Sequence, residues 1–77
     1  MREGGYKMER QLERSKMRFE SFSGKYQGER LEREINLRTK KITNPEKLMS
    51  WIAVLENKNF NECADYARVK AMAMGIN

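Results

Sequence analysis

Neither an internal disulfide nor a zinc site can stabilise this chain, because its 77 residues include a single cysteine, Cys63, and no histidine. A chain of this length buries only about 60% of the surface that its unfolded form exposes, so a small core must hold it together. Association with a second copy, or folding onto a partner, is the remaining source of added stability. The single cysteine is also typical of a reducing compartment.

Charge divides the chain into two unlike halves. Residues 1–43 carry 12 Lys/Arg and 7 Asp/Glu, a net charge of +5, whereas residues 44–77 carry 4 of each and are neutral. The neutral half holds Trp51, Phe60, Tyr66 and the alanines. This division predicts a cationic contact surface attached to a small packed unit.

Residues 1–28 are predicted to form a charged N-terminal helix, or arm, that ends in a glycine hinge. Glu, Arg, Lys and Gln favour helix throughout this segment, and its apolar residues recur at helical spacing. Ser23-Gly24 and Gly28 predict a turn over residues 23–28. The expected inner face of the helix consists of Met8, Leu12, Ser15, Phe19 and Phe22.

Residues 29–42 carry two competing patterns. The composition of Glu29–Glu34 favours helix. Ile35–Lys40 instead alternates apolar or neutral residues with polar ones, which is typical of a strand. Both structures remain open, and a strand at 34–40 would be short and exposed on one face.

A helical hairpin is predicted for the rest of a second unit, residues 29–77. Asn44 can cap a helix that begins at Pro45 and runs to about Leu55. Its expected inner face is formed by residues at helical spacing, Leu48, Ile52 and Leu55, and is widened by Met49, Trp51 and Val54.

The second helix of the hairpin follows a polar turn at 56–58. Asn59–Glu62 has the spacing of a capping box, and the helix would run to about Met74 and stop at Gly75. Its small residues, Ala67 among them, would let the first helix approach closely. The predicted fold class is therefore mainly α, a charged N-terminal helix plus a C-terminal helical hairpin, with a short strand at 34–40 as the open alternative.

No residue pattern points to catalysis or to a metal. Cys63 has no histidine to activate it and has small apolar neighbours, which is typical of a buried structural thiol. Glu62 and Asp65 could form a carboxylate pair, but Glu62 fits the first turn of a helix, where negative charge is favourable. We expect no enzymatic activity and no cofactor.

A basic stretch supplies the first candidate contact surface. Cations bind nucleic acid because their contact with phosphates releases counterions. Arg38, Lys40 and Lys41 form the part of the stretch that acidic residues do not dilute. The predicted nucleic-acid-binding residues are Arg30, Arg33, Asn36, Arg38, Lys40 and Lys41.

Methionine and tryptophan residues supply the second candidate contact surface. Met-rich faces adapt to varied partners, and Trp is enriched at binding hot spots. The predicted partner-binding residues are Met49, Trp51 and Met72. The alternative is that these side chains fill the core of the helical unit.

From residue 34 onward, the order of elements resembles a ribbon-helix-helix DNA-binding domain. Glu34–Thr39 matches the short strand of that family, and two capped helices follow it. The resemblance implies that the strand pairs with its copy in a second chain and that the ribbon enters the major groove. It also implies that Ile35 and Leu37 pack inward. The residues that would then read bases are Glu34, Asn36 and Arg38.

These observations predict a small basic DNA-binding protein without enzymatic activity, working as a homodimeric transcriptional regulator. The competing hypothesis is a small phage or mobile-element inhibitor that binds and blocks a larger host protein. Apolar runs stay well below the roughly 18 residues of a membrane span, and the first residues lack the apolar core of a signal peptide. We therefore expect a soluble cytoplasmic protein without membrane contact.

Overall fold

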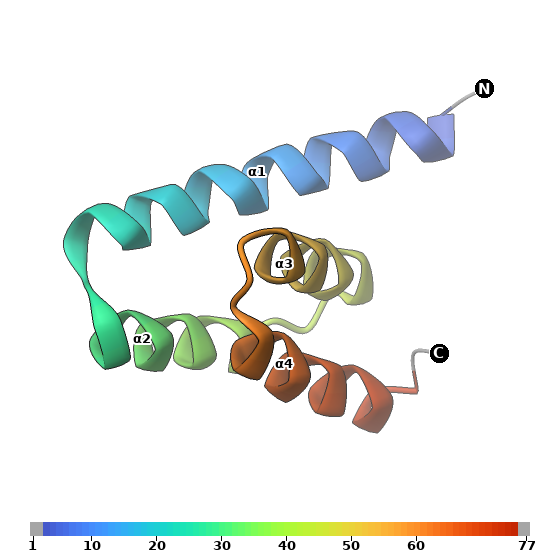
Figure 1. Cartoon of the computed structure of the whole chain (residues 1–77). Helices are drawn as coiled ribbons and strands as arrows, with labels where there is room; N and C mark the ends of the chain where they lie inside the picture. Colours follow the sequence, from blue (N-terminus) through green and yellow to red (C-terminus); the bar gives the residue numbers. More distant parts are fainter. Residues whose placement is uncertain (1–2, 76–77) are drawn as a thin grey trace.

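The computed structural model describes residues 3–75, with side chains from residue 9 onward. α3 lies between α1 and α4, and α2 lies beside α4 (Figure 1). The mainly α fold class is confirmed. The helices of the described range are α1 (Glu3–Lys25), α2 (Gly28–Lys40), α3 (Pro45–Asn57) and α4 (Asn61–Ala73).

The first turn of the chain comes later than the sequence predicted. α1 continues through Gly24, and the backbone N–H of Tyr26 still donates to the carbonyl of Phe22 at 2.9 Å. A single glycine costs a helix only about 1 kcal/mol, and the rings of Phe22 and Tyr26 pack against the core. The chain then reverses at Gly28, whose φ of 59° is a conformation that glycine adopts readily. The predicted turn is thus confirmed at Gly28 and wrong at Gly24, and its role as a hinge stays a prediction.

The segment left open by the sequence, residues 34–40, is helical, and the strand alternative is wrong. Leu31, Ile35 and Thr39 recur every four residues and are buried together on the inner face of α2. Leu37, which a strand would have turned inward beside Ile35, is 45% exposed. Burial at helical spacing therefore outweighs the local alternation of polar and apolar residues, and residues 3–75 contain no strand.

The predicted start of α3 is confirmed. The side-chain oxygen of Asn44 accepts hydrogen bonds from the backbone N–H groups of Glu46 at 2.9 Å and Lys47 at 3.3 Å. Pro45 occupies the first helical position, where its missing N–H has no partner to lose. α3 ends slightly beyond the expected Leu55.

The predicted capping box at the start of α4 is wrong. Asn59 adopts a φ of 66°, and its backbone N–H donates to the carbonyl of Glu56 at 3.1 Å, so Asn59 helps to end α3 instead of capping α4. Phe60 takes the capping position without a side-chain hydrogen bond, and its ring packs edge-on against Phe19 at 5.1 Å. The expected stop of α4 is confirmed at Gly75, which has a φ of 86°.

One core joins the four helices. The residues expected on the inner faces of the hairpin are buried, except Met49, which is 38% exposed. Leu55 and Ala67 are fully buried. Trp51 of α3 and Ile35 of α2 are also fully buried. Leu48, Ile52 and Val54 complete the confirmed set.

α1 is fastened to this core by few side chains. Phe19 and Ser15 are buried, and Phe22 is half-buried. Leu12, expected on the inner face, is 41% exposed, and Met8 lies outside the described side chains. α1 therefore runs close along α3 while burying few of its own side chains.

Candidate anion-binding pocket

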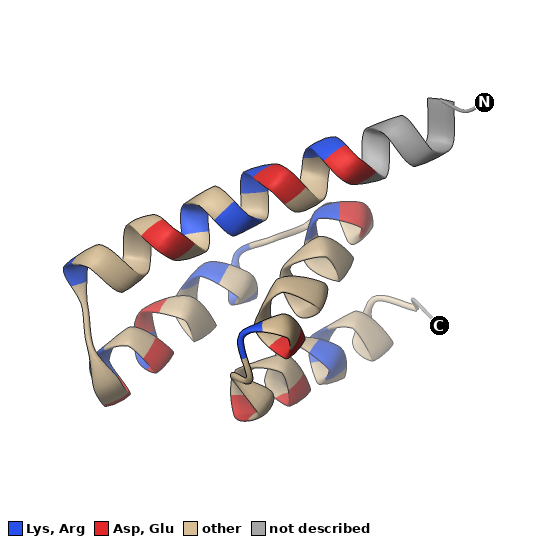
Figure 2. Cartoon of the chain, turned by 45° about the horizontal axis from the view of Figure 1, so that its top comes forward, with Lys and Arg blue, Asp and Glu red and all other residues tan. Residues whose placement is uncertain are grey.

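A pocket of about 790 Å³ lies where α1, the end of α2 and the start of α3 meet. In Figure 2 the cationic segments in the middle of α1 and at the end of α2 lie close together. None of the described residues that line the pocket is acidic. Its cationic residues are Arg14 and Arg18 of α1, Arg38 of α2, Lys41 of the following loop and Lys47 of α3.

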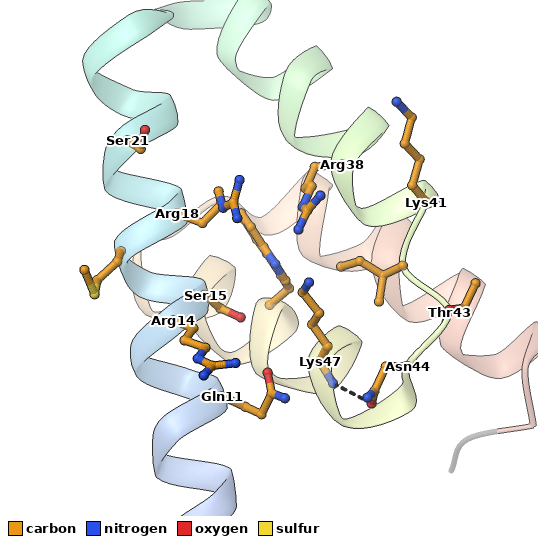
Figure 3. Close-up of a pocket in the computed structure, with 13 residues that line it drawn as sticks. Gln11, Arg14, Ser15, Arg18, Ser21, Arg38, Lys41, Thr43, Asn44 and Lys47 are labelled. Atoms are coloured by element: carbon orange, nitrogen blue, oxygen red, sulfur yellow. Dashed lines mark hydrogen bonds between the residues drawn. The ribbon is translucent and has the colours of Figure 1, made fainter.

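Three of these cations extend into the same opening from different helices. Figure 3 shows Arg18, Arg38 and Lys47 directed toward one another's charged ends. Arg14 lies one turn below Arg18 on α1, and Lys41 extends away from the centre of the opening. The pocket thus has an α1 wall and a facing wall from α2 and α3.

A small-residue contact sets the distance between the two walls. The hydroxyls of Ser15 and Ser50 lie 2.7 Å apart, and both residues are buried. Ser50 also donates to the carbonyl of Lys47 at 2.7 Å, so Ser15 is the donor to Ser50. This contact holds α1 close to α3 one residue from Arg14, which places the α1 cations at the rim of the pocket.

Within the described part of the chain, Arg38 carries a buried donor without an acceptor. Its residue is half-buried, and its Nε is fully shielded from solvent without a hydrogen-bond partner among the described residues. A buried charged donor without an acceptor is costly. An oxygen-bearing anion in the pocket would offset the positive charge of this guanidinium.

The pKa of Lys47 reflects repulsion among the cations of the pocket. Partial burial, followed by the positive charges of Arg38, Arg18 and Arg14, lowers the pKa of its amine below the ordinary value. Among the side chains from residue 9 to 75, no carboxylate forms an ion pair with a pocket cation. The cluster is therefore electrostatically unfavourable without a bound anion.

The beginning of α3 adds to the positive potential. A helix N-terminus carries a partial positive charge, and Asn44 and Lys47 at the start of α3 line the pocket. The Asn44 side chain already accepts from the first free amides, including that of Lys47. The helix end therefore contributes its field, while the side chains supply the donors.

Of the predicted nucleic-acid-binding residues, the pocket receives Arg38 and Lys41. Arg30 lies outside it and is already satisfied, since its Nε pairs with Glu34 at 3.3 Å and its guanidinium lies 5.2 Å from the centre of the Tyr26 ring. The structure thus divides the predicted set.

The rest of that set surrounds a smaller hollow of about 330 Å³ on α2. Arg33, Asn36 and Lys40 line it, but Glu29 and Glu32 do so as well. The carbonyl of Lys40 also accepts from the Lys70 amine. Mixed charge makes this hollow a weaker candidate for an anion than the larger pocket.

Sequence reasoning missed Arg14, Arg18 and Lys47. Arg10, Arg14 and Arg18 recur every four residues, and no acidic residue stands three or four positions from Arg14 or Arg18. On a helix such spacing places like charges in one row, where they repel. The row of arginines on α1 was therefore detectable in the sequence as a helix face with unbalanced charge. Lys47 was not detectable in this way, because it reaches the same pocket only through the packing of α3 against α1.

The predicted partner-binding residues do not form one surface. Trp51 is fully buried and its ring lies 6.2 Å from that of Phe22, so its assignment to a contact surface is wrong and the core alternative holds. Met49 is 38% exposed on α3 and Met72 is 74% exposed on α4, and their role stays a prediction.

Cys63 is buried, as expected. Burial, followed by the charges of Glu32 and Glu62, raises the pKa of its thiol to about 11. The Cys63 thiol donates to the carbonyl of Glu32 with 3.8 Å between sulfur and oxygen. The thiol is therefore neutral at physiological pH and ill-suited to act as a nucleophile.

No family model, curated protein or solved structure matches the chain. The ribbon-helix-helix resemblance therefore stays a prediction, and the strand that it requires is helical here. Within the part of the chain that the structure describes, no helix has the length and apolarity to cross a membrane. That same part contains no group of His, Cys, Asp or Glu side chains fit to hold a metal ion.

Proposed function

We propose that this chain is a non-enzymatic DNA-binding protein that contacts the phosphate backbone with its cationic pocket. One observation carries the proposal: five cations line one pocket, and no described lining residue is acidic. Phosphate contacts by such cations release counterions from DNA, which supplies most of the affinity of sequence-independent binding.

The lining chemistry favours phosphates over bases. Trp51, the aromatic residue of the pocket wall, is fully buried and offers no surface on which a base could stack. Guanidinium groups such as those of Arg18 and Arg38 match phosphate geometry with paired N–H donors. We therefore propose backbone recognition with little preference for sequence.

Fluorescence anisotropy with a labelled mixed-sequence duplex tests this function. Binding should weaken linearly with the logarithm of salt concentration, by a slope of about −0.9 for each phosphate neutralised. If three or four pocket cations take part, the total slope is roughly −3 to −4. Absence of binding at low salt, or affinity that does not change with salt, would contradict the proposal.

A protein partner is the second candidate function, and one exposed surface favours it. Tyr66, Val69 and Met72 recur every three residues on α4 and are 46%, 65% and 74% exposed. A larger protein that this chain binds and blocks would cover such a stripe. Val69→Asp should then abolish that contact, whereas it should leave duplex binding unchanged, because the stripe lies outside the pocket.

A further inference from the structure

We propose that the pocket is a bridging site for one compact phosphate group, held between the α1 wall and the wall formed by α2 and α3. Occupation of the site fastens α1 to the rest of the fold. The inference deepens the proposed function where the phosphate belongs to DNA, and a free oligophosphate offers the same chemistry.

The two walls supply complementary donors for such a group. Arg38 and Lys47 stand on one side, and Arg18, with Arg14 one turn away, stands on the other (Figure 3). After partial burial, the positive charges of the three arginines are the next cause of the lowered pKa of Lys47. A phosphate between the walls replaces repulsion across the pocket with attraction on both sides.

Arg38 adds a specific reason for an oxygen ligand. Its Nε is shielded from water and has no acceptor among the described residues. Phosphate oxygens accept charge-assisted hydrogen bonds from guanidinium groups in paired geometry. A phosphate at this wall lies against the charge of the Arg38 guanidinium, which has no carboxylate partner among the described side chains.

α1 lies close along α3 but buries few of its own side chains, which makes the site a control point. α1 buries Phe19 and Ser15, but Leu12 and Met17 are 41% and 62% exposed. Its cations also face those of α2 and α3. Helices with few buried contacts open locally at low cost, and a ligand that binds only the closed form suppresses that opening. Phosphate binding therefore reduces the detachment of α1.

Hydrogen exchange of the full chain, followed by mass spectrometry, tests the bridge. The probe is sodium tripolyphosphate, compared with sodium chloride at the same ionic strength. At a probe concentration of about ten times its Kd, exchange in α1 should slow roughly tenfold. The last turn of α4 can fray with the pocket intact, so its exchange should not change. If tripolyphosphate slowed exchange equally in both helices, or in neither, the proposed bridging site would be overturned.

Variants separate bridging from simple binding. The double change R14Q/R18Q removes the α1 wall, so tripolyphosphate should no longer slow exchange in α1. R38Q should have the same effect from the facing wall. R30Q is the matched control, because Arg30 is paired with Glu34 outside the pocket. Protection of α1 that survives both R14Q/R18Q and R38Q would refute the site.

The two proposals can fail separately. If tripolyphosphate protects α1 but duplex DNA does not bind, the phosphate site stands and the DNA-binding function fails. If duplex DNA binds through the pocket but neither DNA nor tripolyphosphate protects α1, the DNA-binding function stands and the bridge is overturned.

Discussion

The cations on the two sides of this protein have opposite surroundings. Along α3 and α4, Arg68 contacts the carboxylates of both Glu56 and Asp65. In the pocket, Arg18 and Arg38 face other cations, and no carboxylate of the described side chains pairs with them. The pairing of charges, more than their number, is therefore the criterion by which we propose the pocket, and not the Arg68 face, as a binding surface.

Packing differs between the same two sides. The α3–α4 side buries Leu55 and Ala67 completely, whereas α1 contributes Phe19, Ser15 and the half-buried Phe22 to the core. The hairpin should therefore determine the stability of the fold, and the pocket should determine binding. Changes on the two sides should separate these properties.

The largest expected effect is on the hairpin. Ile52→Ala removes a buried side chain of α3 and should lower the free energy of unfolding by about 2–5 kcal/mol, measured by urea denaturation. Met49→Ala, at an exposed position of the same helix, is the control and should change stability by about 0.5 kcal/mol or less. An Ile52→Ala variant as stable as its control would mean that the hairpin is not the stabilising side.

A second effect on the hairpin side depends on pH. The folded-state pKa of Cys63 is raised from 9.0 to about 11, so the stability it contributes is complete below pH 9 and is lost as pH rises toward 11. The loss is on the order of 2–3 kcal/mol. Chemical denaturation of the wild type and Cys63→Ala across this range measures it as a difference between the two curves. Parallel curves would show that the thiol is not desolvated.

A smaller effect is expected for the paired cation. Arg68→Ala removes exposed ion pairs, which typically contribute about 0.2–1 kcal/mol. Thermal unfolding should show this small loss, and the affinity for duplex DNA should stay the same. A clear loss of DNA affinity would extend the binding surface onto α4 and break the comparison between the two sides.

The smallest expected effect is a gain in stability, whereas the changes above lower it. The pKa of Lys47 is lowered, so its protonated form costs the ligand-free fold some stability at neutral pH, and that cost is relieved as pH rises toward the ordinary value for lysine. Lys47→Gln should therefore raise the melting temperature slightly and weaken DNA binding. Lys16→Gln, an exposed α1 cation that does not line the pocket, should do neither. A lower melting temperature for Lys47→Gln would contradict the repulsion.

Features that local chemistry determines could be predicted from the sequence. Asn44 and Pro45 start α3 because both effects act within one turn, and Gly75 ends α4 because few residues accept its backbone conformation. The buried positions of Leu48 and Leu55 follow from helical spacing.

Features that depend on tertiary packing could not be predicted. Residues 34–40 satisfied both a strand and a helix pattern until the packing of α2 selected the helix. Asn59 lies between two helices and could help to end α3 or to cap α4. In the structure its backbone N–H bonds to Glu56 at the end of α3. Likewise, Arg18, Arg38 and Lys47 are distant in sequence and meet only because α1 packs on α3.

The most direct test compares Arg38→Gln with Arg30→Gln in duplex binding across a salt series. Both changes remove one positive charge from α2, but Arg38 lies in the pocket without an ion pair and Arg30 is paired with Glu34. Arg38→Gln should weaken binding and reduce the salt slope by about 0.9, while Arg30→Gln should leave the slope unchanged. Equal losses in both variants would show that net charge alone governs binding and would contradict the pocket as the binding site.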